Sequence, residues 1–284
     1  MAMFSRSHAL LIGVPGLAKT LMITTIAKSI NLSYNRIQFT PDLMPSDIMG
    51  TEILDENRKF KFVKGPIFAN IVLADEINRT PPKTQSALLE AMQERSVSMN
   101  AVTYDLPDPF FVLATQNPIE QEGTYPLPEA QQDRFMFNIY LDYPTLEEEV
   151  DIVKSTIHGD MVEPQQVLSI EEIIFYQKLL QKIPITDNLY QYAVNLASST
   201  RPNGINAHPW AKEYLMWGAG PRASQFLIIG ARTHAVLNGK YSPDIEDVRA
   251  VAHNILRHRI IKNYKAEAEG ITIENIIDKL IDSI

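Results

Sequence analysis

The stretch HALLIGVPGLAKTLMITTIAKSI, residues 8–30, decides the fold of this chain. Residues 8–12 form an apolar strand, residues 13–20 a loop with two glycines and a lysine, and residues 21–30 carry apolar side chains at helical spacing. A loop between a strand and a helix can turn its backbone N–H groups inward, where they bind phosphate oxygens together with the helix N-terminus. The sequence therefore predicts a phosphate-binding loop at residues 13–20.

The residues of this loop have expected roles in holding a nucleotide. We expect Lys19 to reach the β- and γ-phosphates and the Thr20 hydroxyl to bind Mg²⁺. Ala18 stands where the usual signature has glycine, and alanine is tolerated there if the position is already helical. A glycine-bearing turn into a helix is the alternative, but the flanking strand and helix favour a nucleotide. The predicted nucleotide-binding residues are Gly13, Val14, Pro15, Gly16, Leu17, Ala18, Lys19 and Thr20.

A second apolar strand, residues 71–74, ends in two carboxylates, Asp75 and Glu76. Unpaired buried charge is costly, so such a pair needs a metal, a water or a catalytic role. Asp75 fits a partner of Mg²⁺, and Glu76 fits the group that activates or orients the attacking water. A solvated acidic loop is the alternative, and the preceding phosphate-binding loop makes it the weaker one.

A third buried strand, residues 110–114, leads into Thr115-Gln116-Asn117-Pro118. A polar side chain at the tip of this strand could orient water or touch the γ-phosphate, and we choose Asn117 for that role. Turn formation is the alternative, because Asn-Pro is itself a turn signal.

Strands that alternate with helices predict a parallel sheet with helices on both faces. Further strands are expected at residues 36–39 and 135–141, and a helix capped by Thr80 at residues 81–94. After residue 143 only helical patterns occur, so we expect an α/β core of residues 1–143 with a parallel five-stranded sheet, and a helical domain of residues 144–284. Its expected helices are 146–158, 170–182, 187–199, 223–238, 245–256 and 272–284, with a loop at 206–210.

We expect two small antiparallel hairpins, one at residues 50–62 with its turn at 55–57 and one at residues 96–106 with its turn near 100–101. Neither is needed to complete the sheet. Additional hairpins on a scaffold often contact partners, although ordinary connecting loops fit these segments equally well.

The composition is that of a globular chain long enough for a large and a smaller domain. Of 284 residues, 45% are hydrophobic and 21% charged, so a packed core is available. The net charge of −8 disfavours nucleic acid as a partner, and the lack of cysteine excludes disulfides, thiolate metal sites and cysteine nucleophiles. No signal peptide pattern and no apolar stretch of about 18 residues occurs, so we expect a cytoplasmic protein without a membrane span.

Five segments together resemble the motifs of the MoxR family of AAA+ ATPases. They are the phosphate loop with its alanine at 13–20, LADEINR at 73–79 with the helix at 81–94, the sensor 1 segment ATQNP at 114–118, the arginine-finger segment LPEAQQDRF at 127–135, and the sensor 2 segment GPRA at 220–223. The resemblance covers nearly the whole chain. It implies an AAA+ P-loop NTPase core followed by an all-α lid domain.

The resemblance also implies Mg²⁺-dependent ATP hydrolysis in a ring, usually a hexamer, with ATP at the subunit interfaces. Arg134 would then act in trans, as a finger in the neighbour's site, and Arg222 would reach the γ-phosphate from the lid in cis. A surface ion pair and a helix-terminus salt bridge are the respective alternatives. The hairpin at 96–106 is similar to the helix-2 insert of this clade, which includes magnesium chelatase subunits. The expected catalytic residues are Glu76, Asn117, Arg134 and Arg222, and the expected metal ligands are Thr20 and Asp75.

The family is thought to act as chaperones that mature enzymes, insert metals or assemble complexes, often alongside proteins with von Willebrand factor A domains. Only 12 residues precede Gly13, fewer than the family's N-terminal helical segment that helps to hold adenine, so no adenine-contacting residue is named. Two alternatives stay open. One is a nucleic-acid-stimulated motor of the same fold, which needs a basic pore or an added DNA-binding domain. The other is a nucleotide-binding scaffold that does not hydrolyse.

Overall fold

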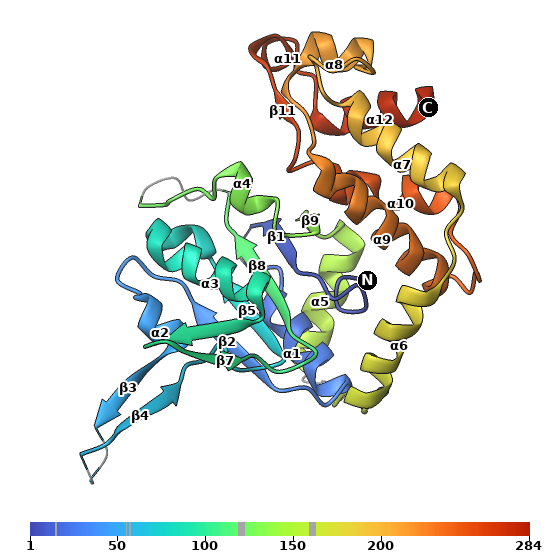
Figure 1. Cartoon of the computed structure of the whole chain (residues 1–284). Coiled ribbons are helices and arrows are strands. Elements are labelled where there is room, and N and C mark those ends of the chain that lie inside the picture. The colour runs from blue at the N-terminus through green and yellow to red at the C-terminus, as the bar shows by residue number, and fades with distance from the viewer. Residues whose placement is uncertain (15, 55, 57, 119–122, 159–162) are drawn as a thin grey trace. The chain divides into compact units, whose positions relative to one another are not determined.

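A five-stranded parallel sheet occupies the first half of the chain (Figure 1). The structure is a computed structural model that describes residues 1–14, 16–54, 56, 58–118, 123–158 and 163–284. The strands lie in the order β2-β5-β8-β1-β9. They are β1 (Ala9–Gly13), β2 (Tyr34–Gln38), β5 (Ile71–Asp75), β8 (Phe111–Gln116) and β9 (Phe137–Leu141), so each expected strand is confirmed to within two residues.

The register of the central strands decides which residues meet at the edge of the sheet. The apolar residues 71–74 of β5 are at most 1% exposed, as expected of a strand covered on both faces. β5 runs parallel to both of its neighbours, with Ala74 beside Ile37 of β2 and Ala114 of β8. Because parallel strands end at one edge, the polar residues that follow β5 and β8 come together there.

The helices of this part are α1 (Lys19–Ser29), α2 (Pro45–Met49), the 3-10 turn η1 (Ile77–Arg79) and α3 (Pro82–Glu94). The expected helix at 81–94 is thereby confirmed, but its expected cap is wrong. Pro81 is the N-cap residue of α3, and no side chain caps the helix. Thr80 is fully buried, and its hydroxyl donates a hydrogen bond to the Leu43 carbonyl at 3.4 Å instead.

Both expected hairpins are confirmed. They consist of β3 (Gly50–Leu54) with β4 (Phe60–Lys64), and β6 (Ser96–Met99) with β7 (Val102–Asp105). Asn100 and Ala101 turn the second hairpin with φ of 48° and 64°, the left-handed values that a two-residue hairpin turn requires. The turn expected at 55–57 includes residues 55 and 57, which lie outside the described residues.

The two hairpins touch each other. Phe62 and Tyr104 stack with ring centroids 4.3 Å apart, and the Asn100 amide donates to Glu52 at 2.6 Å. The expected correspondence of residues 96–106 with a helix-2 insert is wrong, because β6–β7 follows the third helix, α3. An insert in the second helix must leave the chain between β2 and β5. The hairpin in that position is β3–β4, directly after α2 (Figure 1).

The remainder of the chain is mainly helical, as expected. Its helices are α4 (Glu129–Gln132), α5 (Leu146–His158), α6 (Ile170–Lys182), α7 (Asp187–Ser199), α8 (Pro209–Tyr214), α9 (Pro221–Leu237), α10 (Ile245–Leu256), α11 (Tyr264–Ala268) and α12 (Ile273–Ser283). The loop expected at 206–210 is wrong in its last residues, because α8 begins at Pro209 and the His208 ring caps it by accepting from the Trp210 N–H. A short antiparallel pair, β10 (Leu215–Trp217) with β11 (Ile261–Lys262), was not expected.

The chain divides into two compact units. One comprises Leu10–Pro126 and Ile139–Ile174, and the other comprises Met1–Ala9, Leu127–Asn138 and Phe175–Ile284. The segment that contains Arg134 thus belongs to the same unit as helices α7 to α12. The domain boundary expected between residues 143 and 144 stays a prediction. Among the described residues, no helix has both the length and the apolar character needed to cross a membrane.

Candidate nucleotide site

The predicted phosphate loop connects β1 to α1, as the sequence required. Gly13 ends β1, and a Cβ there would lie 2.8 Å from both the Cβ and the carbonyl oxygen of Leu141, so only glycine fits. Gly16 has φ of +88°, a value that favours glycine. Val14, which follows Gly13, is half-buried. Pro15 lies outside the described residues.

Ala18 is not helical, so the condition under which an alanine was expected to be tolerated at this position is not met. Ala18 is the N-cap residue of α1 and lies in the left-handed region, with φ of 50° and ψ of 25°. A residue with a Cβ pays roughly 1–2 kcal/mol for this conformation, which explains why the usual signature has glycine at this place. The loop of this chain therefore holds a strained alanine directly before its lysine.

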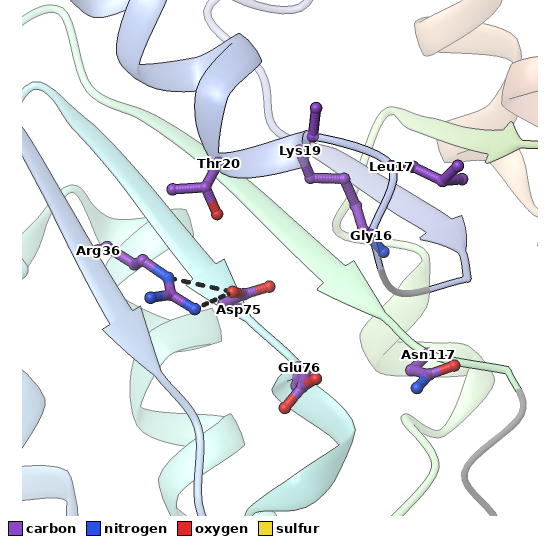
Figure 2. Close-up of a pocket in the computed structure, with 9 residues that line it drawn as sticks. Gly16, Leu17, Lys19, Thr20, Arg36, Asp75, Glu76 and Asn117 are labelled. Atoms are coloured by element: carbon purple, nitrogen blue, oxygen red, sulfur yellow. Dashed lines mark hydrogen bonds and ion pairs between the residues drawn. The ribbon is translucent and has the colours of Figure 1, made fainter. Parts of the chain in front are cut away.

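Lys19 is folded over its own loop. Its Nζ donates a hydrogen bond to the carbonyl oxygen of Gly13 at 2.7 Å. Burial lowers the pKa of Lys19 from its ordinary value, while the charges of Asp75 and Glu76 oppose this shift. The amine is therefore held beside the backbone that would surround a phosphate, and Thr20 follows it on the first turn of α1 (Figure 2).

The two carboxylates after β5 are tied to neighbouring strands. Arg36 of β2 donates to Asp75 Oδ2 from Nη2 at 2.6 Å and from Nε at 3.1 Å. Thr115 of β8 donates from its hydroxyl to Asp75 Oδ1 at 2.6 Å, and the same hydroxyl accepts the backbone N–H of Glu76 at 2.9 Å. A metal bound by Asp75 would compete with Arg36 for this carboxylate.

Glu76 follows β5 in the left-handed region, with φ of 57°. Its Oε2 accepts hydrogen bonds from Gln38 Nε2 at 2.8 Å and from Arg79 Nη1 at 3.0 Å. Two donors thus hold the proposed water-activating carboxylate in place. Arg79 thus contacts the candidate site of its own chain.

These side chains surround one pocket of about 340 Å³ (Figure 2). Asn117, only 5% exposed, lines the pocket together with Asp75, Glu76 and the phosphate loop. The ends of β5 and β8 therefore meet at one edge of the sheet, as expected from the sequence. Arg36 also lines the pocket and was missed, as was Gln38, because the pairing of β2 with β5 leaves no local signal in the sequence. The lining residues are Gly16, Leu17, Ala18, Lys19, Thr20, Arg36, Asp75, Glu76 and Asn117.

The donor set of this pocket fits a nucleotide with Mg²⁺. Mg²⁺ prefers oxygen ligands and usually takes only one or two from the protein, the rest coming from phosphate and water. The Thr20 hydroxyl and the Asp75 carboxylate are of this type, and Lys19 supplies the positive charge that a triphosphate needs. No cluster of three or more histidine, aspartate or glutamate side chains with metal-binding geometry occurs in the described parts of the chain.

The two expected arginines lie in the other compact unit. Arg222, at the start of α9, donates from Nη1 to Asp133 Oδ2 at 2.9 Å. Arg134 follows α4 and is half-buried, and none of the described carboxylates forms an ion pair with it. Their contact with a nucleotide stays a prediction.

Comparisons with known proteins agree with this geometry. Residues 8–137 match the ATPase family associated with various cellular activities (AAA), and residues 208–280 match the AAA lid domain. Chaperone MoxR1 of Mycobacterium tuberculosis is 43% identical over all of this chain and 75% of its own length, and the uncharacterized protein YeaC of Bacillus subtilis is 42% identical over all of this chain and 86% of its own. A crystal structure of a provisionally assigned ATPase from Cytophaga hutchinsonii has a TM-score of 0.92 and 44% identity, covering all of this chain and 86% of that one.

Proposed function

Because the chain belongs to the MoxR family of AAA+ ATPases, we propose that it binds ATP with Mg²⁺ in the pocket lined by Lys19. We propose further that it hydrolyses this ATP to remodel partner proteins. The observation that carries this proposal is the meeting of Lys19, Asp75, Glu76 and Asn117 around one pocket. A phosphate-binding loop alone would also fit a passive nucleotide site. The two carboxylates at the end of β5 supply what hydrolysis needs in addition.

Five residues of the pocket have a part in the proposed reaction. Lys19 exchanges the Gly13 carbonyl for the β- and γ-phosphate oxygens, beside the N–H groups of the loop. Thr20 and Asp75 would hold Mg²⁺, which when bound would offset charge on the phosphate oxygens. Glu76 accepts a proton from the attacking water or orients it, and Asn117 holds that water or the γ-phosphate from the tip of β8.

Two arginines complete the proposed site. Arg222 leaves Asp133 and binds the γ-phosphate of its own subunit, while Arg134 enters the site of a neighbouring subunit in a ring, which we take to be a hexamer. An arginine finger stabilises the charge that develops on the transferred phosphoryl group and is worth about 10³-fold or more in rate. The lack of an ion pair at Arg134 within the described residues supports its use by another subunit.

The proposed outcome of hydrolysis is work on a client protein. The name of the similar Chaperone MoxR1 supports a chaperone role, and the hairpins β3–β4 and β6–β7 are surfaces that could touch a client. We propose maturation of the client, or insertion of a metal or cofactor into it, with a von Willebrand factor A domain protein as a second partner. The cytoplasm is the proposed compartment.

The proposal is tested by Glu76→Gln. This change keeps the shape of the side chain and removes its ability to accept a proton, so we expect ATP to bind within about twofold of the normal Kd while turnover falls by about 10²-fold or more. Glu90→Gln, the same change on an exposed position of α3, is the matched control and should hydrolyse normally. Turnover of Glu76→Gln close to that of the control would rule out the assigned role of Glu76.

A further inference from the structure

A buried arginine, Arg259, donates hydrogen bonds to the backbone on both sides of Arg134. Its side chain is 2% exposed and lies just beyond α10. Nη2 donates to the carbonyl oxygens of Asp133 at 2.9 Å and Phe135 at 2.7 Å, and Nη1 donates to that of Met136 at 3.3 Å. Nε donates to the Asp133 carboxylate at 2.7 Å. Three of the four residues from 133 to 136 are thus held by one guanidinium, and the remaining one is Arg134.

Burying the charged guanidinium of Arg259 costs free energy of desolvation, so its buried position needs a reason. Burial lowers the pKa of Arg259 to about 10, against the opposing charge of Asp133, and the group stays protonated at neutral pH. The ring of Phe226 lies 5.0 Å from its central carbon, and the Ile255 carbonyl accepts a further hydrogen bond. An apolar side chain of similar size could stabilise this site as well as an ion pair does, but it could not hold three carbonyl groups.

A neighbouring histidine also forms a hydrogen bond with this backbone segment. His258 Nε2 lies 3.0 Å from the Phe135 carbonyl oxygen, and burial lowers the pKa of His258 well below its ordinary value. The ring is therefore neutral, and because a carbonyl only accepts, the proton is on Nε2. The Phe135 carbonyl receives two donors, while the guanidinium of Arg134 has no ion pair with any described carboxylate. The backbone is fixed and the side chain is left for a partner outside the unit.

We propose that Arg259 is a positioning residue for Arg134, an inference that rests on the proposed action of Arg134 in a neighbouring site. It holds the segment 133–136 so that the finger is presented in one geometry. Asp133 links this segment to Arg222, because its Oδ1 accepts from Arg259 and its Oδ2 from Arg222. When Arg222 leaves for the γ-phosphate, Arg259 still holds Asp133, so the segment that carries the finger keeps its backbone conformation.

The substitution that tests this role is Arg259→Lys. A lysine keeps the charge but has one nitrogen, so it cannot reach the carboxylate and three carbonyls together. We expect turnover to fall by about 10- to 100-fold, the effect of misplacing a catalytic group by roughly 1 Å, with the Kd for ATP changed less than about twofold. Arg249→Lys, at a half-exposed position of α10, is the matched control and should change neither quantity.

Mixed assemblies separate loss of the finger from loss of the fold. Glu76→Gln subunits have a dead site and an intact finger, whereas Arg134→Ala subunits have an intact site and no finger. An equal mixture of Arg259→Lys with Glu76→Gln should recover about a quarter of normal turnover, because half of the subunits have a working site and half of their neighbours a working finger. A mixture of Arg259→Lys with Arg134→Ala should recover nothing.

The outcomes distinguish this inference from the proposed function. If Glu76→Gln rescues Arg134→Ala but not Arg259→Lys, or if Arg259→Lys loses ATP binding, Arg259 is structural and the inference is wrong. If Glu76→Gln fails to rescue Arg134→Ala, Arg134 does not act in trans, and the inference about Arg259 is then also wrong. Neither of these two variants changes Arg259, so this result tests the proposed function separately. Should Arg259→Lys not fold, Phe226→Leu carries the test. It removes the ring against the guanidinium and should give a smaller loss of turnover with the same pattern of rescue.

Discussion

Ala18 is the residue at which the phosphate loop departs most from the conformation its side chain prefers. Its φ of 50° lies in the left-handed region. Ala18→Gly relieves strain of roughly 1–2 kcal/mol and adds freedom to the unfolded chain worth roughly 0.5–1 kcal/mol, so we expect the free energy of unfolding to rise by about 0.5–1 kcal/mol. Denaturant unfolding of both proteins measures the difference.

The matched control for this change is Ala250→Gly, at an exposed position inside α10. There the backbone is right-handed helical, so the same substitution should lower stability by about 1 kcal/mol. Opposite signs at the two positions would establish the strain at Ala18. A loss of equal size at both would contradict it.

At the scale of residues, the sequence predicted the groups that carry local patterns. Lys19, Asp75 and Asn117 each stand at the end of a strand or the start of a helix, and the parallel register brings them to one pocket. Arg36 and Gln38 could not be predicted, since their contacts with the two acids depend on β2 being the neighbour of β5. The conformation of Ala18 depends on the closure of the whole loop and was also missed.

At the scale of elements, the segment after α10 joins that helix to the residues before β9, and His258 gives this junction a pH dependence. Burial is the main cause that lowers the pKa of His258 well below 6.5 in the folded state. Below pH 6.5 the unfolded chain therefore binds a proton that the folded chain does not, and stability is lost as the pH falls through that value. From pH 7 to 5.5 this one group should lower the free energy of unfolding by about 1 kcal/mol.

The measurement is the free energy of unfolding at pH 7 and 5.5 for the natural protein and for His258→Gln. Glutamine can still donate to the Phe135 carbonyl but does not titrate, and all other titrating groups are common to both proteins. The variant should show the smaller decrease between the two pH values. Equal decreases would show that His258 does not stay neutral in the folded state.

The elements themselves were largely predictable, with exceptions that have physical causes. Long periodic segments such as α3 and α5 were confirmed because many residues share the pattern. β10 and β11 contain three and two residues, too few to show alternation, and they form by pairing across the chain. α8 was missed entirely, because the histidine and proline at its start resemble a loop in sequence.

At the scale of the whole molecule, the sequence predicted an AAA+ core followed by a helical lid, and this is confirmed. The grouping of residues 127–138 with the later helices was not predictable, since it depends on contacts such as those of Arg259, more than 120 residues away along the chain. The client protein could not be predicted from the sequence, because a binding surface assembled from separate hairpins, as we propose, leaves no local motif. The identity of the client is therefore a question for capture with the Glu76→Gln protein.

The central claim is that ATP is hydrolysed at sites completed by a second subunit. It is tested most directly by phosphate release per subunit as a function of protein concentration, for the natural protein and for Arg134→Ala. We predict that the specific activity of the natural protein rises steeply as subunits assemble. We expect Arg134→Ala to bind ATP normally and to match the natural protein at low concentration, but to stay at that level, about 10³-fold below the assembled natural protein. A specific activity that is constant from the lowest concentration, and equal in the two proteins, would contradict the claim.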